Sequence, residues 1–137
     1  MPKGGDLNAA RGHITGIGGV FFRAREREHL AEWYQEVLGL PVTDAATAQV
    51  GETVWAAFDR GTSYFGPNRQ DFMINYRVDD LDGALHNLRA AGASVSPDIQ
   101  QDEYGRFAWA VDPEGIRFEL WEPTGHAEPR HPGDGRD

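Results

Sequence analysis

The sequence contains no cysteine. This absence excludes disulfide scaffolds, thiolate metal sites and cysteine nucleophiles, and nothing points to an oxidising compartment. Long apolar runs are also missing, because the longest, at residues 20–22 and 54–58, are far too short to span a bilayer. Residues 1–12 lack the apolar stretch of a signal peptide. We therefore expect a cytoplasmic protein with no membrane partner.

Basic residues are scarce: 13 Lys and Arg stand against 22 Asp and Glu, giving a net charge of -9. Such a field repels phosphate backbones, so nucleic acid is not an expected partner. The 137 residues, 39% of them hydrophobic, are enough for one domain with a real core. Residues 1–12 and 124–137 have no apolar periodicity, and we expect both segments to be flexible.

Two segments have the apolar spacing of amphipathic helices. Residues 26–38 carry one stripe, and Gly39 follows it. Residues 81–91 carry a second, and Gly92 ends it. Strand-like runs at residues 17–23 and 72–78 precede the two predicted helices.

These two strand–helix units resemble each other, since Val20 aligns with Ile74 and Phe22 with Tyr76. Further strand-like pieces follow each helix, at residues 41–44, 53–58 and 63–65 in the first half and 94–99, 106–111 and 116–121 in the second. Each half therefore reads β-α-β-β-β. We expect two modules, residues 13–68 and 69–123, that share one domain.

Two motifs carry a family resemblance: Trp-Tyr-Gln-Glu-Val-Leu-Gly-Leu at residues 33–40 and Asp-Pro-Glu-Gly-Ile-Arg-Phe-Glu-Leu at residues 112–120. Together with the two modules they resemble the vicinal-oxygen-chelate superfamily of glyoxalases, bleomycin-resistance proteins and ring-cleaving dioxygenases. The resemblance implies an α+β fold in which two tandem βαβββ modules form a curled mixed-sheet cup, with one helix packed behind each module. It also implies a homodimer, because family members commonly complete their cups across subunits.

Metal-dependent members of this superfamily place His, Glu or Gln at four cup positions. The resemblance puts one position at Gly19, one at Met73, one within residues 55–58 and one at Glu119. Glycine has no side chain, a thioether is a poor ligand for hard ions, and residues 55–58 contain no ligand type. One carboxylate cannot hold the ion, so we expect a degenerate metal site and no cofactor.

Strand side chains alternate between faces, which sorts residues into those under a helix and those in the cup. Met73, Asn75 and Arg77 are predicted to face the cup. The aromatic and polar mixture suits a small-molecule pocket. The candidate ligand-binding residues are Phe21, Arg23, Trp55, Met73, Asn75, Tyr104, Phe107, Trp109 and Trp121. The alternative to ligand binding is ordinary core packing for any single Trp. For the two arginines the alternative is a position at the rim of the cup.

Glu119 is predicted to lie inside the cup without the ion that its family counterpart would coordinate. A buried carboxylate must be protonated, hydrated or paired with a cation. Arg77 is the first candidate partner and Arg23 the alternative, because both are predicted at inward strand positions.

Three functions fit these features. The first is a protein that binds a small aromatic or anionic molecule, since inward Arg23 and Arg77 favour a carboxylate or enolate although the net charge suits a cation. The second is a metal-independent lyase, isomerase or hydrolase of the same superfamily, with Glu119 as base and Arg77 as electrostatic stabiliser. The third is a dimeric interaction module with an empty cup. Whether residues 64–66 or Tyr104 close the cup stays open.

Overall fold

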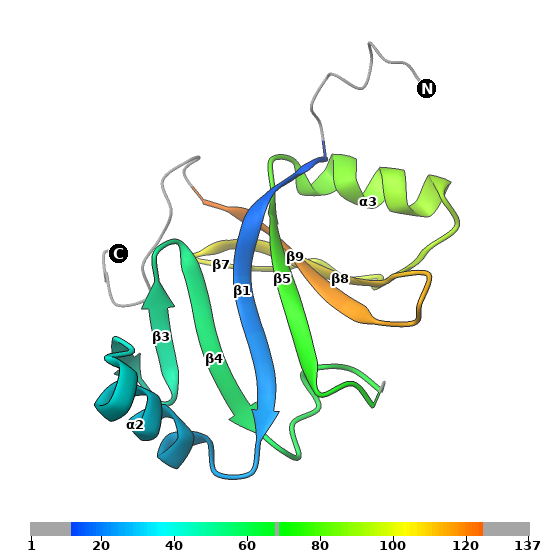
Figure 1. The fold of residues 1–137 in the computed structure, drawn as a ribbon. Helices are drawn as coiled ribbons and strands as arrows, with labels where there is room; N and C mark the ends of the chain where they lie inside the picture. Colours follow the sequence, from blue (N-terminus) through cyan, green and yellow to red (C-terminus); the bar gives the residue numbers. More distant parts are fainter. Residues whose placement is uncertain (1–11, 68, 125–137) are drawn as a thin grey trace.

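The computed structural model describes residues 12–67 and 69–124. These residues form one open mixed sheet of nine strands and two helices (Figure 1). The elements in chain order are β1 (Ile14–Ala24), α2 (Arg27–Leu38), β2 (Val42–Asp44), β3 (Thr47–Val50), β4 (Thr53–Asp59), β5 (Phe72–Val78), α3 (Leu81–Ala90), β6 (Ser94–Val95), β7 (Gln100–Asp102), β8 (Gly105–Val111) and β9 (Arg117–Pro123). The predicted α+β fold class is confirmed.

Three local predictions need correction. Residues 63–65 form a turn, closed by the bond from the Gly66 N–H to the Ser63 carbonyl at 2.9 Å. Only Ser94–Val95 of the segment 94–99 is a strand. Strands β3 and β7 were not predicted. The turn before β3 uses Ala45 and Ala46 at positive φ, where glycine or asparagine is usual. The segments predicted to be flexible lie, except for Gly12 and Thr124, outside the described residues.

The two predicted halves meet through their first strands, β1 and β5, which lie side by side in the middle of Figure 1. They run antiparallel, with Gly19 opposite Asn75 and Phe21 opposite Met73. Each is also parallel to the last strand of its own half, β1 to β4 and β5 to β9. The register therefore has the twofold symmetry that the sequence repeat implies.

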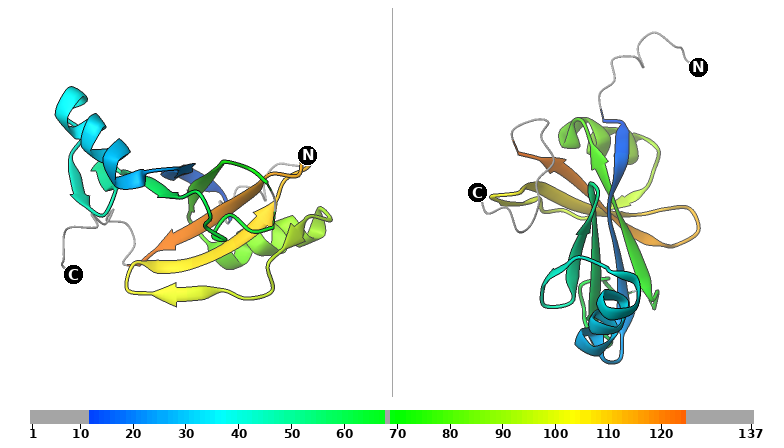
Figure 2. Two further views of the ribbon diagram at one scale, coloured as in Figure 1. Left: turned by 90° about the horizontal axis from the view of Figure 1, so that it is seen from below. Right: turned by 60° about the vertical axis from the view of Figure 1, so that its left-hand side comes forward.

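The sheet has one helix face and one cup face, because residues paired across strands point to the same side. On the helix face, Phe22 packs with the α2 cluster and Tyr76 with the α3 cluster. Burial of these apolar side chains is the main force that holds the helices to the sheet. Figure 2 shows that β8 and β9 cross the direction of β1 and β4. The cup face of the sheet, opposite the helices, is therefore strongly curved.

Neither helix is long and apolar enough to cross a membrane, within the part of the chain that is described.

Candidate functional site

Glu119 lies at the centre of the cup face, on β9, and is 1% exposed. The register places it beside Asn75 of β5, whose Nδ2 donates to Glu119 Oε1 at 2.6 Å. The hydroxyl of Tyr64 donates to Oε2 at 2.5 Å. Both partners are neutral side chains, so the carboxyl group is satisfied by hydrogen bonds rather than by an ion pair.

Aromatic side chains surround this carboxyl group. Phe65, Met73 and Trp109 form a buried cluster, against which Phe21, Phe58 and Phe107 pack. The ring of Tyr64 stacks on Phe58, with centroids 5.2 Å apart and planes 13° apart, and meets Trp109 edge-on at 6.1 Å. The cup face is therefore a largely apolar wall with one buried carboxyl group in it.

Two residues of the loop between β4 and β5, Tyr64 and Phe65, lie over the cup face. Phe65 of this loop is fully buried, and Tyr64 reaches the central carboxyl group. Arg23 fastens the loop at both ends. Its Nη1 donates to the Arg60 and Thr62 carbonyls at 2.7 and 2.8 Å, and its Nε donates to the Gln70 carbonyl at 3.1 Å.

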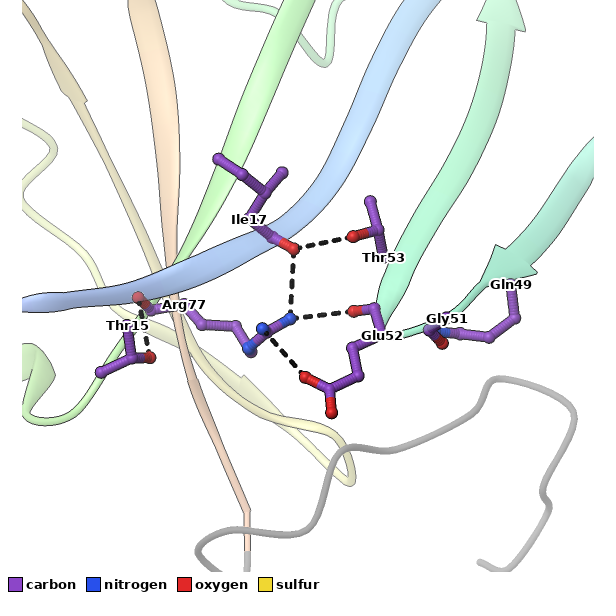
Figure 3. A network of polar contacts seen from close by, with 7 residues as sticks. All are labelled: Thr15, Ile17, Gln49, Gly51, Glu52, Thr53 and Arg77. Carbon is purple, nitrogen blue, oxygen red and sulfur yellow. Dashed lines mark hydrogen bonds and ion pairs between the residues drawn. The ribbon is translucent and has the colours of Figure 1, made fainter.

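Neither arginine predicted to pair with Glu119 does so. Arg23 binds the loop carbonyls, and Arg77 extends along β1 to Glu52 (Figure 3). Arg77 Nη1 donates to the Ile17 and Glu52 carbonyls at 3.1 and 2.8 Å, and its Nη2 lies 3.3 Å from Glu52 Oε1. Gly16 leaves the room for this path, because a Cβ there would lie 2.2 Å from Arg77 Nη2. The predicted arginine–Glu119 pair is wrong.

The positive charge of Arg117 lowers the pKa of Glu119. Strand alternation places Arg117 on the cup side, but it was not among the predicted site residues. It lies two residues before Glu119 on the same strand, so both point to the same face. Its guanidinium lies over the Trp109 ring, 5.4 Å from the centroid. The signal that could have found it is this shared face.

The surroundings shift the pKa values of Glu119 and Tyr64. Burial raises the pKa of Glu119 above its usual value and outweighs the hydrogen bonds from Tyr64 and Asn75 and the charge of Arg117, which lower it. The Trp109 indole N–H also lowers the pKa of Glu119, without reaching hydrogen-bond geometry. Burial and the neighbouring Glu119 raise the pKa of Tyr64. The pair therefore favours a protonated phenol beside a carboxyl group that holds its proton more tightly than usual.

This shift predicts how stability depends on pH. The usual pKa of a glutamate carboxyl group is 4.5, and folding raises the pKa of Glu119 above it, so the folded state binds the proton more tightly. Its contribution to stability is fully present below about pH 4.5 and is lost as pH rises towards the raised pKa. Glu119→Gln cannot titrate. We expect the variant to gain stability relative to the wild type as the pH increases from about 4 to about 8, measured by denaturant unfolding. A difference that grows in the opposite direction would show a lowered pKa.

The other predicted site residues fall into three groups. Phe21, Met73, Asn75 and Trp109 lie around Glu119 as predicted, while their binding roles remain predictions. Phe107 and Trp121 stack on each other further along the cup, 5.9 Å apart, and the Tyr104 carbonyl accepts a bond from Trp121 Nε1 at 2.8 Å. Trp55 lies on the helix face with Phe22 and Tyr34, so its predicted position in the cup is wrong.

The residues at the four positions where metal-dependent members of the family carry ligands do not fit a divalent metal ion. Ala56 lies beside Phe21 as Glu119 lies beside Asn75, so the register assigns the undecided position of the first half to alanine. The family resemblance puts the other two positions at Gly19 and Met73, neither of which has a side chain suited to a hard ion. No group of three or more His, Asp or Glu side chains among the described residues could hold an ion. The carboxyl group of Glu119 is bonded to protein side chains instead.

A separate groove of about 860 Å³ lies outside the cup, at the N-terminal end of α2. Its lining includes Arg25 and Arg60 together with Trp33 and Tyr34 of the helix. Arg23, which binds the carbonyl groups of the loop, also lines this groove.

Comparisons with known proteins agree with this architecture. A family model described as a glyoxalase-like domain matches residues 19–121. None of the curated proteins matches the chain. A structure of methylmalonyl-CoA epimerase from Mycobacterium tuberculosis aligns with a TM-score of 0.64 at 18% identity, over 81% of this chain and 89% of the epimerase.

Two further solved structures are similar. A variant of the Streptomyces coelicolor methylmalonyl-CoA epimerase, in complex with 2-nitronate-propionyl-CoA, has a TM-score of 0.61 at 16% identity, over 82% of this chain and 99% of that one. A hypothetical protein from Bacillus halodurans has a TM-score of 0.62 at 11% identity, over 82% of this chain and 96% of that one. At such identities the likeness shows the fold.

Proposed function

Because this chain belongs to the family of glyoxalase-like domains, we propose that it binds a small aromatic or anionic molecule in the cup, at Glu119 and without a metal ion. One observation carries this proposal: a buried carboxyl group, bonded to Asn75 and Tyr64, stands in an aromatic wall. Small-molecule sites are commonly apolar pockets with a few placed polar groups.

The charges near Glu119 support an anionic group on the molecule. Arg117 is the cation that acts on the carboxyl group, and its guanidinium lies over Trp109. A guanidinium recognises carboxylates and enolates by charge and by paired N–H donors. We assign the recognition of the anionic group to Arg117 and not to Arg77, because Arg77 is bound to Glu52.

A second candidate is a metal-independent enzyme, and the Tyr64–Glu119 hydrogen bond favours it. A carboxyl group with a raised pKa next to a phenol can give or take a proton at a bound substrate. Arg117 would then stabilise developing negative charge. Formation of a product from a bound molecule would distinguish an enzyme from a binding protein.

Metal content tests the proposal directly. Purified protein, dialysed against a weak chelator, is expected to contain well below one Zn, Ni, Mn or Fe per chain by elemental analysis, because only Glu119 among the four positions has a metal-binding side chain. Glu119→Ala should leave the metal content unchanged. Exposed Glu114 provides a matched control as Glu114→Ala. Near-stoichiometric metal that Glu119→Ala alone removes would refute the metal-free site.

The homodimer and the cytoplasmic location remain predictions. The exposed apolar side chains of Trp33, Val37 and Leu38 on α2 support an association between copies of the chain.

A further inference from the structure

The side chain of Tyr64 lies at the centre of the cup face, in contact with its aromatic residues and with its carboxyl group. It comes from the covering loop, not from a strand of the cup. Its ring stacks on Phe58, its edge meets Trp109, and its hydroxyl donates to Glu119. The chain thus satisfies its own buried acceptor with a phenol.

Tyr64 is placed so that its side chain can leave. The residue is 37% exposed, whereas Glu119 below it is 1% exposed. Its backbone N–H is bound within the loop, to Thr62 Oγ1 at 3.1 Å, and Arg23 holds the loop ends independently. Rotation of this one side chain would break its hydrogen bond to Glu119 without breaking a strand pairing.

Two buried donors in the same wall have no acceptor. The Trp109 Nε1–H, which faces Glu119 without reaching hydrogen-bond geometry, and the Arg117 Nε–H make no hydrogen bond in the described part of the chain. Trp109 is 7% exposed, and the Arg117 guanidinium lies over its ring. Buried donors without partners are costly, and an anionic oxygen would satisfy both.

We propose that the molecule bound in the cup is a phenol that carries an acidic group, with its hydroxyl replacing that of Tyr64 on Glu119 and its anion meeting Arg117 and Trp109. Its ring would pack on Phe58 after the Tyr64 side chain has rotated away. The inference rests on the proposed function and specifies its ligand class. An aromatic acid without a hydroxyl would leave the Glu119 acceptor unsatisfied, so the hydroxyl is the discriminating group.

Binding of 3- and 4-hydroxybenzoate, benzoate and phenol to the full chain tests this inference by calorimetry. We expect at least one hydroxybenzoate to bind at least tenfold more tightly than benzoate. We also expect Tyr64→Ala to bind that hydroxybenzoate at least tenfold more tightly than the wild type, because the competing side chain is gone. Tyr64→Phe, which keeps the ring, should show part of this gain. Arg117→Met should remove the preference for the hydroxybenzoate over phenol. Tyr34→Ala, on the helix face, is the matched control and should bind like the wild type.

The outcomes separate the two proposals. Equal binding of benzoate and both hydroxybenzoates to folded Tyr64→Ala and Tyr64→Phe would overturn the phenol inference and leave the binding site in place. Absence of binding by every one of these compounds to both folded variants would overturn the inference and count against a ligand site at Glu119.

Discussion

Replacement of Phe65 by alanine is expected to lower the free energy of unfolding by about 3–5 kcal/mol. Phe65 is fully buried although it belongs to a loop, and it packs in the cluster with Met73 and Trp109. Its ring centroid also lies 5.0 Å from the guanidinium of Arg23, which fastens the loop. The substitution leaves a cavity and removes this contact, so denaturant unfolding should show a large loss.

Phe72 is the matched control, because it is the same residue type at 47% exposure. Phe72→Ala should cost below about 1 kcal/mol. Equal losses for the two variants, or a loss below about 1 kcal/mol for Phe65→Ala, would show that the loop does not close the cup in solution.

Asn75 and Glu119 are expected to be strongly coupled in a double-mutant cycle. Asn75→Leu leaves Glu119 Oε1 without its donor, and Glu119→Met leaves the Asn75 amide and the Tyr64 hydroxyl without an acceptor. Each single variant should lose about 1.5–3 kcal/mol. The double variant should lose less than the sum by about 1 kcal/mol or more, because both members of the buried bond are then absent.

Arg77→Met paired with Glu119→Met is the control cycle. Arg77 is bound to Glu52, so this pair should be additive within about 0.5 kcal/mol. Coupling of Glu119 to Arg77, with additive behaviour towards Asn75, would restore the ion pair that strand alternation predicted and contradict the observed cup.

Strand alternation predicted the faces correctly where one face was clearly more apolar. In β5, Met73 and Asn75 face the cup while Tyr76 and Val78 face α3, as predicted. In β9, Phe118 and Leu120 lie under α3 and Glu119 in the cup. The period of two carries this information without any knowledge of contacts.

Alternation failed in β4, because residues 54–58 are apolar on both faces and no contrast fixes which side is inward. The register shows that Trp55, opposite Val20, lies under α2, whereas Phe58 lies in the cup. A run buried on both sides does not reveal its orientation from sequence.

The partners of the central carboxyl group depended on tertiary structure. Arg77 reaches Glu52 because Gly16 leaves space, and Tyr64 reaches Glu119 across 55 residues of sequence because the loop folds over the cup. Sequence periodicity predicts which face of the sheet a side chain lies on. It does not predict which distant residue a long side chain contacts, or the path that a loop takes.

The methyl group of Met73 tests the metal-free site most directly. The chain has two methionines, so methyl-¹³C labelling gives a simple NMR spectrum, and fully buried Met73 lies beside Trp109 and Phe65. We expect aromatic acids to shift the Met73 signal equally with and without EDTA, and Glu119→Gln to weaken this response. Aromatic acids that leave the signal unchanged, while Zn²⁺ or Mn²⁺ shifts or broadens it, would contradict a metal-free binding site at Glu119.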